Sequence, residues 1–353
     1  MLHPNSPAQM GYAFPAEWAP HTATWLSWPH KEASWPGKLA SIYPVYAEFV
    51  RLLSEVEQVH INVCDAGMQA RTAQMLRDAG ARMSQVLLHI HPTNDAWCRD
   101  HGPAFVVNPR APQPKALVKW KYNAWGEKYP PHDLDNEIPY HIARFLELPV
   151  FEPGIVMEGG SIEVNGRGTL MTTEACLLNP NRNPQLSRQE IESYLKAYYG
   201  QTRVLWLKDG IVGDDTDGHI DDLTRFVDPE TVVTVVESNP DDENYEVLQE
   251  NLDLLRGFTL ENGHPLRIIE LPMPDPVWYE GQRLPASYAN FYIANGLVVV
   301  PVYRCPQDGL ALEILASCFP DRRVVGLDST DLIWGLGSFH CLSQQEPAAD
   351  GMS

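Results

Sequence analysis

Hydrophobic residues follow two different periods along the chain, and stretches of the two kinds alternate from one end to the other. Short apolar runs rich in β-branched residues, typical of strands, recur throughout. They lie at 59–64, 86–90, 116–120, 204–207, 231–236, 266–270, 297–302 and 323–327. Between them, apolar residues take the spacing of a helix. This alternation predicts a mixed α/β fold.

Three helical patterns can be recognised from the sequence. Tyr46 begins a series of apolar residues spaced by three and four positions, with Pro44 near its start. Ser187, followed three residues later by a glutamate, forms a capping box ahead of the second pattern, and Gly200 is placed to end that helix. The third pattern lies within 245–255. We expect a helix at each place.

The length of 353 residues allows one large domain or two. Thirty prolines mark many loops, but none of these loops is long or polar enough for an interdomain linker. We therefore predict a single domain over residues 1–353, with a frayed tail at 346–353.

The net charge of the chain limits the classes of molecule that it is expected to bind. Its 46 acidic residues exceed its 26 basic ones, which gives a formal net charge of -20. Nucleic acids and anionic membranes favour clustered lysine and arginine, so neither is an expected partner. A small cationic substrate is the partner that this charge would attract.

The compartment and the cysteines also follow from the sequence. No apolar run has the roughly 18 residues of a membrane helix, and the N-terminus lacks a secretory signal pattern, so we expect a cytoplasmic protein. The six cysteines never form a Cys-x-x-Cys spacing, which predicts free thiols. His89 and His91 could offer two metal ligands, but without a third ligand nearby we interpret them as ordinary residues.

An acidic segment, Asp214-Asp-Thr-Asp-Gly-His-Ile-Asp-Asp222, surrounds one histidine. If Ile220 continues a strand, His219 and Asp221 point to the same face. The segment fits a calcium loop poorly, because placing Gly218 at the sixth position puts a glycine at the first position and a threonine at the twelfth. The segment is either part of an active site or a solvated turn.

A second candidate is the segment Gly335-Leu-Gly-Ser-Phe-His-Cys341. Its glycines predict a sharply turning backbone that a substrate can approach closely. Cys341 is either a nucleophile or a small buried hydrophobe. On a strand, His340 would point to the opposite face and could not be its base, whereas His219 is free for that role.

Two further segments carry possible binding groups. Trp97 and Asp100 offer an aromatic face and a carboxylate to a planar cation, although a structural tryptophan with an Arg99–Asp100 ion pair would explain them as well. Glu158 precedes two glycines and could be a ligand or a buried orienting group. The alternative is a tight turn that opens a strand.

Together the segments supply a thiol, an imidazole and carboxylates with aromatic walls. They contain no set of metal ligands and no phosphate-binding loop. This combination suits a guanidinium substrate, whose charge must be neutralised while its carbon is attacked.

The chain resembles the agmatine deiminases and their bacterial peptidylarginine deiminase relatives over nearly its whole length. The segments that carry the resemblance are Ala16-Glu-Trp-Ala-Pro-His-Thr-Ala-Thr-Trp-Leu-Ser-Trp-Pro29, Asn94-Asp-Ala-Trp97, Arg99-Asp100, Asn123-Ala-Trp-Gly126, Glu158-Gly-Gly-Ser161, Leu178-Asn-Pro-Asn-Arg-Asn-Pro184, 215–221, Ala286-Ser-Tyr-x-Asn-Phe-Tyr292 and His340-Cys-x-x-Gln-Gln345. It implies the pentein fold, with five ββαβ-type units around a central active-site channel. It also implies a homo-oligomer and no metal or other cofactor.

The resemblance also implies roles for particular residues. Cys341 would be the nucleophile, His219 the general acid and base, and Asp100 and Asp221 the groups that hold the guanidinium. Other residues expected at the site are Glu158, Trp97, Trp125 and Asn290. The chain departs from the family pattern at Gly335-Leu-Gly-Ser-Phe and at Glu163, where histidine is frequent, and we expect Glu163 at the rim of the pocket.

The resemblance implies hydrolysis of agmatine to N-carbamoylputrescine and ammonia through an amidino intermediate on Cys341, a step of polyamine metabolism. The acids Asp214, Asp215 and Asp217 would then receive the distant amine. Deimination of arginine, free or in peptides, is the alternative, but it would favour basic residues at the rim, where the sequence offers only Arg99. A non-catalytic polyamine-binding protein is the third possibility.

Overall fold

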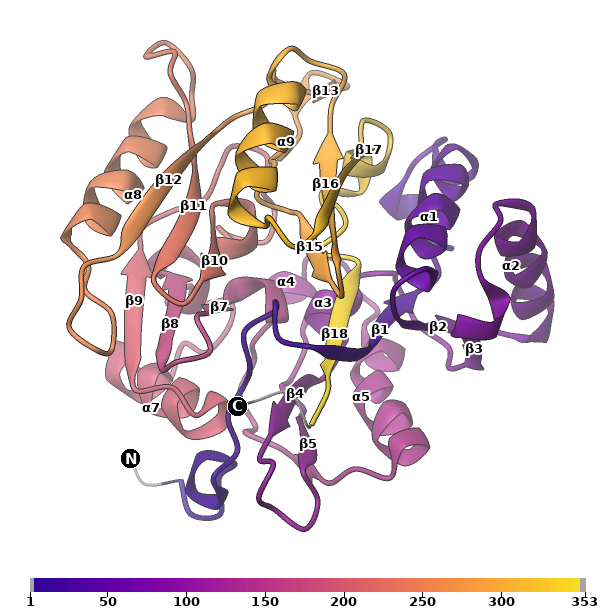
Figure 1. Ribbon diagram of the computed structural model, residues 1–353, viewed down its shortest axis with the longest axis horizontal. Coiled ribbons are helices and arrows are strands. Elements are labelled where there is room, and N and C mark those ends of the chain that lie inside the picture. The colour runs from indigo at the N-terminus through magenta and orange to yellow at the C-terminus, as the bar shows by residue number, and fades with distance from the viewer. Residues whose placement is uncertain (1–2, 350–353) are drawn as a thin grey trace.

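Five sheets with the same strand order form the framework of the computed structural model, which describes residues 3–349. In each sheet an antiparallel pair is extended by a parallel strand. Figure 1 shows the sheets following one another around α3 (Cys98–His101) and the C-terminal strand. The sequence pattern revealed the alternation of strands and helices but not this repeat.

The first sheet holds β18 (Ser343–Pro347), β1 (His21–Ser27), β2 (Gln58–Val63) and β3 (Val86–Ile90). The second sheet holds β4 (Ala104–Val107), β5 (Lys115–Val118) and β6 (Val150–Phe151), and the third holds β7 (Glu163–Val164), β8 (Thr169–Thr173) and β9 (Arg203–Leu207). The fourth holds β10 (Thr224–Asp228), β11 (Thr231–Val236) and β12 (Arg267–Pro272), and the fifth holds β15 (Tyr292–Ala294), β16 (Leu297–Val302) and β17 (Arg323–Asp328). A small hairpin joins β13 (Trp278–Tyr279) and β14 (Gln282–Arg283).

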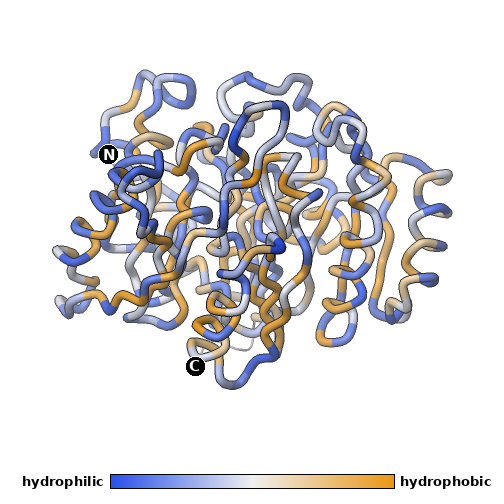
Figure 2. Tube along the Cα trace, turned by 90° about the horizontal axis from the view of Figure 1, so that it is seen from above, coloured by the Kyte–Doolittle hydropathy of each residue, from blue (hydrophilic) through white to orange (hydrophobic). Residues whose placement is uncertain are grey.

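A helix connects the parallel strands of each sheet, because parallel neighbours need a crossover connection. These helices are α1 (Leu39–Ser54), α2 (Ala66–Asp78), α5 (Asp133–Leu146), α7 (Arg188–Tyr199), α8 (Tyr245–Gly257) and α9 (Gln307–Cys318). Short helices α4 (Ala124–Glu127) and α6 (Glu174–Leu177) lie within loops. Hydrophobic and hydrophilic positions alternate along the outer helices in Figure 2, as expected for helices that cover a sheet on one side.

The two ends of the described chain meet in one sheet. β18 pairs with β1 in antiparallel register, with Gln345 opposite Thr24, and Figure 1 shows the two strands side by side. Glu346 is buried and its carboxylate accepts a hydrogen bond from Trp25. The prediction that fraying begins at residue 346 was therefore wrong, and the part of that tail at 350–353 lies outside the described residues.

The clearest sequence signals agree with the structure. Ser187 caps α7 with both hydrogen bonds of the capping box, and Gly200 ends it with a φ of 69°. The first and third predicted helices correspond to α1 and α8, and Pro44 lies inside α1. In residues 3–349, no helix is long and apolar enough to cross a membrane.

Three short turns carry the candidate site to the centre of the molecule. They are α3 and the 3₁₀ turns η4 (Gly159–Ser161) and η5 (Ile220–Asp222), which come directly before β4, β7 and β10, the first strands of three different sheets. α3 packs on η4, η4 packs on η5, and α3 also contacts β18. Residues more than 200 positions apart are thereby brought to one point.

Candidate active site

Cys341 lines a cavity from the turn that leads into β18. Its sulfur accepts a hydrogen bond from Asn290 Nδ2 at 3.0 Å, and its thiol lies 3.6 Å from Asp221 Oδ2. Asn290 Oδ1 also accepts the backbone N–H groups of His340 and Cys341, at 3.1 and 3.3 Å. Asn290 therefore fixes both the sulfur and the turn that carries it.

The glycines ahead of Cys341 allow a close approach, as predicted. A Cβ added to Gly337 would lie 2.6 Å from the Trp97 ring and 3.0 Å from Cys341 Cβ. A Cβ added to Gly335 would lie 2.5 Å from Trp35, which stacks on Trp97 with ring centroids 5.1 Å apart. The loop is thus pressed against aromatic rings, and a larger side chain at either position would displace it.

His219 faces three carboxylates without a full hydrogen bond to any of them. Its Nδ1 lies 3.9 Å from Asp100 Oδ1 and 4.0 Å from Asp221 Oδ1, and its Nε2 lies 3.9 Å from Glu158 Oε2. Within the described chain, both ring nitrogens, Glu158 Oε2 and Asp221 Oδ1 are buried atoms without a hydrogen-bond partner. Buried polar atoms are nearly always paired, so unpaired atoms gathered around one point indicate the place of a polar ligand.

The strand geometry expected for His219 and Asp221 was wrong. His219 immediately precedes the single 3₁₀ turn η5. The reason is the Asp214 carboxylate, whose Oδ2 accepts the backbone N–H groups of Gly218 and His219 at 3.0 Å each. These bonds hold the backbone in a turn instead of an extended strand, but the turn still brings the His219 imidazole and the Asp221 carboxylate close together.

The other acids of this segment have different surroundings. Asp217 binds Arg182 Nη1 at 2.5 Å through one oxygen and Lys128 Nζ at 2.8 Å through the other, and it does not line the cavity. Asp215 does line the cavity, with its side chain 43% exposed, and it contacts Tyr129 Oη and Lys128 Nζ. Of the three acids predicted to receive the distant end of a substrate, Asp214, Asp215 and Asp217, only Asp215 lines the cavity and is placed to do so.

The paired glycines after Glu158 bring η4 directly onto the site. A Cβ added to Gly160 would lie 2.6 Å from His219 Nδ1, and the Gly160 N–H donates to Asp100 Oδ1 at 2.9 Å. Glu158 Oε1 accepts a 2.6 Å hydrogen bond from Arg182 Nε, while its other oxygen faces His219. The segment is a tight turn, which was the alternative interpretation of the sequence. The same turn also places the buried carboxylate of Glu158 at the site.

A cavity of about 260 Å³ extends from Cys341 past aromatic side chains. Its lining includes Asp95, Trp97, Asp100, Trp125, Tyr129, Asp215, Tyr279, Trp334 and Cys341. Trp125 Nε1 donates to Asp100 Oδ2 at 2.9 Å, so this wall also holds a carboxylate. The alternative Arg99–Asp100 ion pair was wrong, because Arg99 is buried and donates to Gln345 at 2.7 Å. Arg99 is consequently no rim residue either.

Burial and mutual repulsion shape the charges of the site. Burial raises the pKa of Asp100 to about 6, and the charges of Asp221 and Glu158 act in the same direction. Burial opposes a charge on His219, but the carboxylate of Asp100, the Cys176 thiol and Asp221 hold its pKa well above the ordinary value.

The nucleophile candidate is a thiol in the absence of substrate. Burial, and then the charges of Asp221, Asp222 and Asp100, raise the pKa of Cys341 well above its ordinary value. A cation bound among these carboxylates would cancel their repulsion of a thiolate.

Two sets of side chains in residues 3–349 have three possible metal-binding atoms within 4.8 Å of one another. They are Glu158 with Cys176 and His219, and Asp221 with Asp222 and Cys341. Both sets belong to the site described above.

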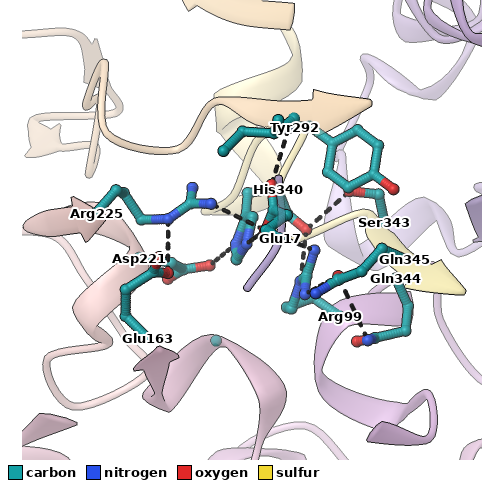
Figure 3. Close-up of polar contacts among 12 residues, drawn as sticks. Glu17, Arg99, Glu163, Asp221, Arg225, Tyr292, His340, Ser343, Gln344 and Gln345 are labelled. Carbon is teal, nitrogen blue, oxygen red and sulfur yellow. Dashed lines mark hydrogen bonds and ion pairs between the residues drawn. The ribbon is translucent and has the colours of Figure 1, made fainter. Parts of the chain in front are cut away.

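Behind the site lies a network of buried charges that sequence reasoning missed, shown in Figure 3. Its members are Glu17, Arg99, Glu163, Arg225 and His340. Arg225 donates to Glu17 at 2.9 Å and to Glu163 at 2.8 Å. Glu163 was expected at the rim, and that expectation was wrong, because Arg225 and the Phe226 N–H hold it in the interior. The only sequence signal was that Glu17 and Arg225 stand as isolated charges in largely apolar stretches.

A thiol, an imidazole and three carboxylates therefore converge on one buried point within a mixed α/β fold, an arrangement that defines an enzyme acting on a cationic, hydrogen-bonding group. The chain belongs to the Porphyromonas-type peptidyl-arginine deiminase family, whose model matches residues 13–347. A curated agmatine deiminase homologue of Legionella pneumophila is 36% identical over 345 residues, which cover 97% of each chain.

Solved structures agree in fold. The agmatine deiminase of Enterococcus faecalis has a TM-score of 0.91 and 32% identity, and 99% of each chain is covered. A Cys→Ser variant of the C. jejuni agmatine deiminase with substrate bound has a TM-score of 0.85 and 31% identity, with 95% of this chain and 96% of that chain covered. The fold is that of agmatine deiminases, as the resemblance implied.

Proposed function

We propose that the protein hydrolyses agmatine to N-carbamoylputrescine and ammonia through a covalent intermediate on Cys341. The observation that carries this proposal is the set of unpaired buried atoms on Glu158, His219 and Asp221. A guanidinium is planar, positively charged and rich in N–H donors, and it matches carboxylate oxygens in pairs. The agmatine deiminase structure with substrate bound supports the same assignment.

The reaction follows from the placement of these groups. The guanidinium binds among Asp100, Glu158 and Asp221, and its charge lets Cys341 lose its proton to the solvent. The thiolate attacks the guanidinium carbon, and His219, protonated at the start, gives a proton to one nitrogen, which leaves as ammonia. A thiouronium remains on the sulfur.

Water completes the cycle. Neutral His219 takes a proton from water, and the resulting hydroxide adds to the carbon of the thiouronium. The carbon–sulfur bond then breaks as the added hydroxyl forms the ureido carbonyl and releases its proton to the solvent. The ureido product leaves and the Cys341 thiolate is restored. Orientation by the carboxylates contributes several kcal/mol, since it holds the carbon beside the sulfur.

The outer cavity favours agmatine over arginine. Among the described residues, its lining contains the acids Asp95 and Asp215 and no lysine or arginine. An amine at the distant end of the substrate would find a carboxylate there, whereas the carboxylate of arginine would find no basic partner in the lining. Deimination of peptidyl arginine remains the second candidate because the family bears that description.

One assay separates the candidates. The purified protein is incubated with agmatine, free arginine and a blocked arginine peptide, and ammonia and the ureido product are followed, with Cys341→Ala as the blank. Turnover of agmatine at a kcat/KM well above the other two is expected. Preference for the peptide would replace our first choice by the second, and binding of agmatine without turnover would indicate a non-catalytic binding protein.

We also propose that the chain is a single catalytic domain that assembles as a homo-oligomer and acts in the cytoplasm. The family resemblance supports the assembly. Light scattering on the purified protein tests it, and a monomer at micromolar concentration would contradict it.

A further inference from the structure

His340 has no part in the proposed reaction, yet it is buried between two carboxylates. Its Nδ1 lies 2.6 Å from Asp221 Oδ2, and its Nε2 lies 2.8 Å from Glu17 Oε2. Figure 3 shows the ring between the two acids. Each contact is short enough to require a proton between nitrogen and oxygen.

Both acids have the surroundings of ionised groups. Glu17 Oε2 also accepts from Arg225 at 2.9 Å, and its Oε1 accepts the Ile293 N–H at 2.8 Å. Burial opposes the charge, but Arg225 and then His340 hold the pKa of Glu17 well below its ordinary value. For Asp221, burial is likewise outweighed, first by the hydrogen bond from His340, and its pKa is lowered.

Ionised carboxylates can only accept hydrogen bonds, so both protons belong to the ring and His340 is an imidazolium. The positive charge of His340 offsets the negative charges of Asp221 and Glu17, because two buried carboxylates without a cation would be strongly destabilising. The bond to Oδ2 is the only one that Asp221 receives from a cationic group in the described residues at hydrogen-bond distance. Asp221 Oδ1 is thereby left unpaired and faces the space beside His219.

We propose that His340, held as an imidazolium by Glu17, is the positioning residue of the Asp221 carboxylate and directs Oδ1 towards the bound guanidinium. Glu17 precedes β1, and its partners Arg225 and Ile293 lie in β10 and β15. The orientation of Asp221 is therefore set by three sheets at once. Without His340, Asp221 Oδ2 would be free to turn towards the thiol of Cys341, 3.6 Å away. The inference deepens the proposed function and rests on it for the identity of the ligand.

The test uses two substitutions that each restore one of the two bonds. In His340→Asn the amide nitrogen replaces Nδ1 and can still donate to Asp221, whereas in His340→Gln it replaces Nε2 and can donate only to Glu17. We expect the Asn variant to keep kcat/KM within about tenfold of wild type and the Gln variant to lose about 10²- to 10³-fold. His60→Asn, at a buried histidine of β2 outside the site, is the matched control. Equal losses in both His340 variants, or an Asn variant weaker than the Gln variant, would overturn the proposal.

A second measurement does not need turnover. Cys341 is alkylated with chloroacetamidine, which carries a guanidinium-like cation, and with neutral iodoacetamide, and mass spectrometry follows the Cys341 peptide. His340→Gln should lower the rate with the cationic reagent at least about tenfold more than the rate with the neutral one. Equal changes with both reagents would overturn the proposal. Cation selectivity that depends on His340, in a protein that turns over no guanidine substrate, would retain the inference while the proposed function fails.

Substitution at a buried charge can prevent folding, so a third measurement uses the wild-type protein. Nitrogen-15 NMR of the His340 ring at neutral pH should show a proton on both nitrogens. A proton on only one nitrogen would overturn the proposal.

Discussion

Two buried clusters of charge meet at Asp221, and they differ in how completely their atoms are paired. In the network behind the site, Arg225 donates to two carboxylates and two backbone carbonyls. In the site itself, neither ring nitrogen of His219 has a hydrogen-bond partner in the described chain, and Glu158 and Asp221 each keep one unpaired oxygen. The first cluster is a complete structure, and the second is completed only by a ligand.

The balance of charge differs in the same way. The network holds two arginines within hydrogen-bond reach of its acids, whereas the site has three carboxylates around one imidazole. Glu158 and Asp221 each have one basic partner, Arg182 and His340, but in the described chain Asp100 has none at hydrogen-bond distance. A buried acid without a paired base is unfavourable, so binding a cation is expected to stabilise the folded protein. The two clusters therefore differ in role: the paired network supports the folded structure and the orientation of Asp221, whereas the incompletely paired site serves binding and chemistry.

The largest expected effect on activity comes from Cys341→Ala. Without the sulfur no covalent intermediate forms, and kcat should fall by at least about 10⁴-fold. Agmatine should still bind, as calorimetry would show, because the carboxylates remain. Turnover retained within about tenfold of wild type would remove Cys341 from its proposed role.

The largest expected effect on stability comes from Arg225→Met in the network. It leaves Glu17 and Glu163 without their shared cation, and the free energy of unfolding should fall by about 3 to 5 kcal/mol. Urea denaturation measures this. Arg267→Met, at an exposed ion pair with Asp228, is the control and should change the free energy by no more than about 1 kcal/mol. A similar small change for Arg225→Met would contradict the distinction between the two clusters.

Asp100→Asn should separate activity from stability. The substitution keeps the shape of the side chain but removes one of the crowded charges, so kcat/KM should fall by about 10²- to 10³-fold while the melting temperature stays equal or rises. Thermal unfolding and steady-state kinetics on the same preparation give the answer. A lower melting temperature together with near-normal activity would place Asp100 in the scaffold instead.

The pH dependence sharpens this assignment. Because burial raises the pKa of Asp100 to about 6, the carboxylate is neutral below that pH and attracts the guanidinium less. The kcat/KM for agmatine should therefore fall on the acid side with an apparent pKa near 6, a value that belongs to the coupled group of acids.

The raised pKa also means that the folded state binds this proton more tightly, so the Asp100 contribution to stability decreases as pH rises from about 4 to about 6. Asp100→Asn should remove both trends, and an unchanged acid limb in that variant would rule out Asp100 as its source.

The smallest expected effect is that of Asp215→Asn at the cavity mouth. Its side chain is 43% exposed and already contacts Lys128, so its attraction for the distant amine is partly screened. We expect KM for agmatine to rise about three- to tenfold with little change in kcat. Asp241→Asn, at an exposed acid outside the cavity, is the matched control. Equal KM values for the two variants would argue against a role for Asp215.

The sequence revealed those parts of the molecule that local chemistry determines. Ser187 and Gly200 delimit α7 because capping depends on neighbouring residues. The helix α5 was missed, since it begins with alternating acids and contains Pro139. The residue pattern also missed the repeat of five sheets, which only the family resemblance implied, because its units share strand order without a recognisable sequence repeat.

The same limit applies to the site. Glycines and adjacent acids drew attention to Cys341, His219 and Glu158, but the turn at η5 depends on Asp214, which was expected to face a substrate. The pair of Glu17 and Arg225 is separated by 208 positions and has no local signal. Residues that complete one another across sheets can be recognised only once the fold brings them together.

The most direct test of the account is the structure of Cys341→Ala with agmatine bound. We predict that the guanidinium nitrogens lie within about 3 Å of Glu158 Oε2 and Asp221 Oδ1, the oxygens that lack partners in the free protein, while the contacts of Arg225 stay unchanged. Agmatine bound elsewhere, or bound with these two oxygens still unpaired, would contradict the claim that the incomplete cluster is the binding site.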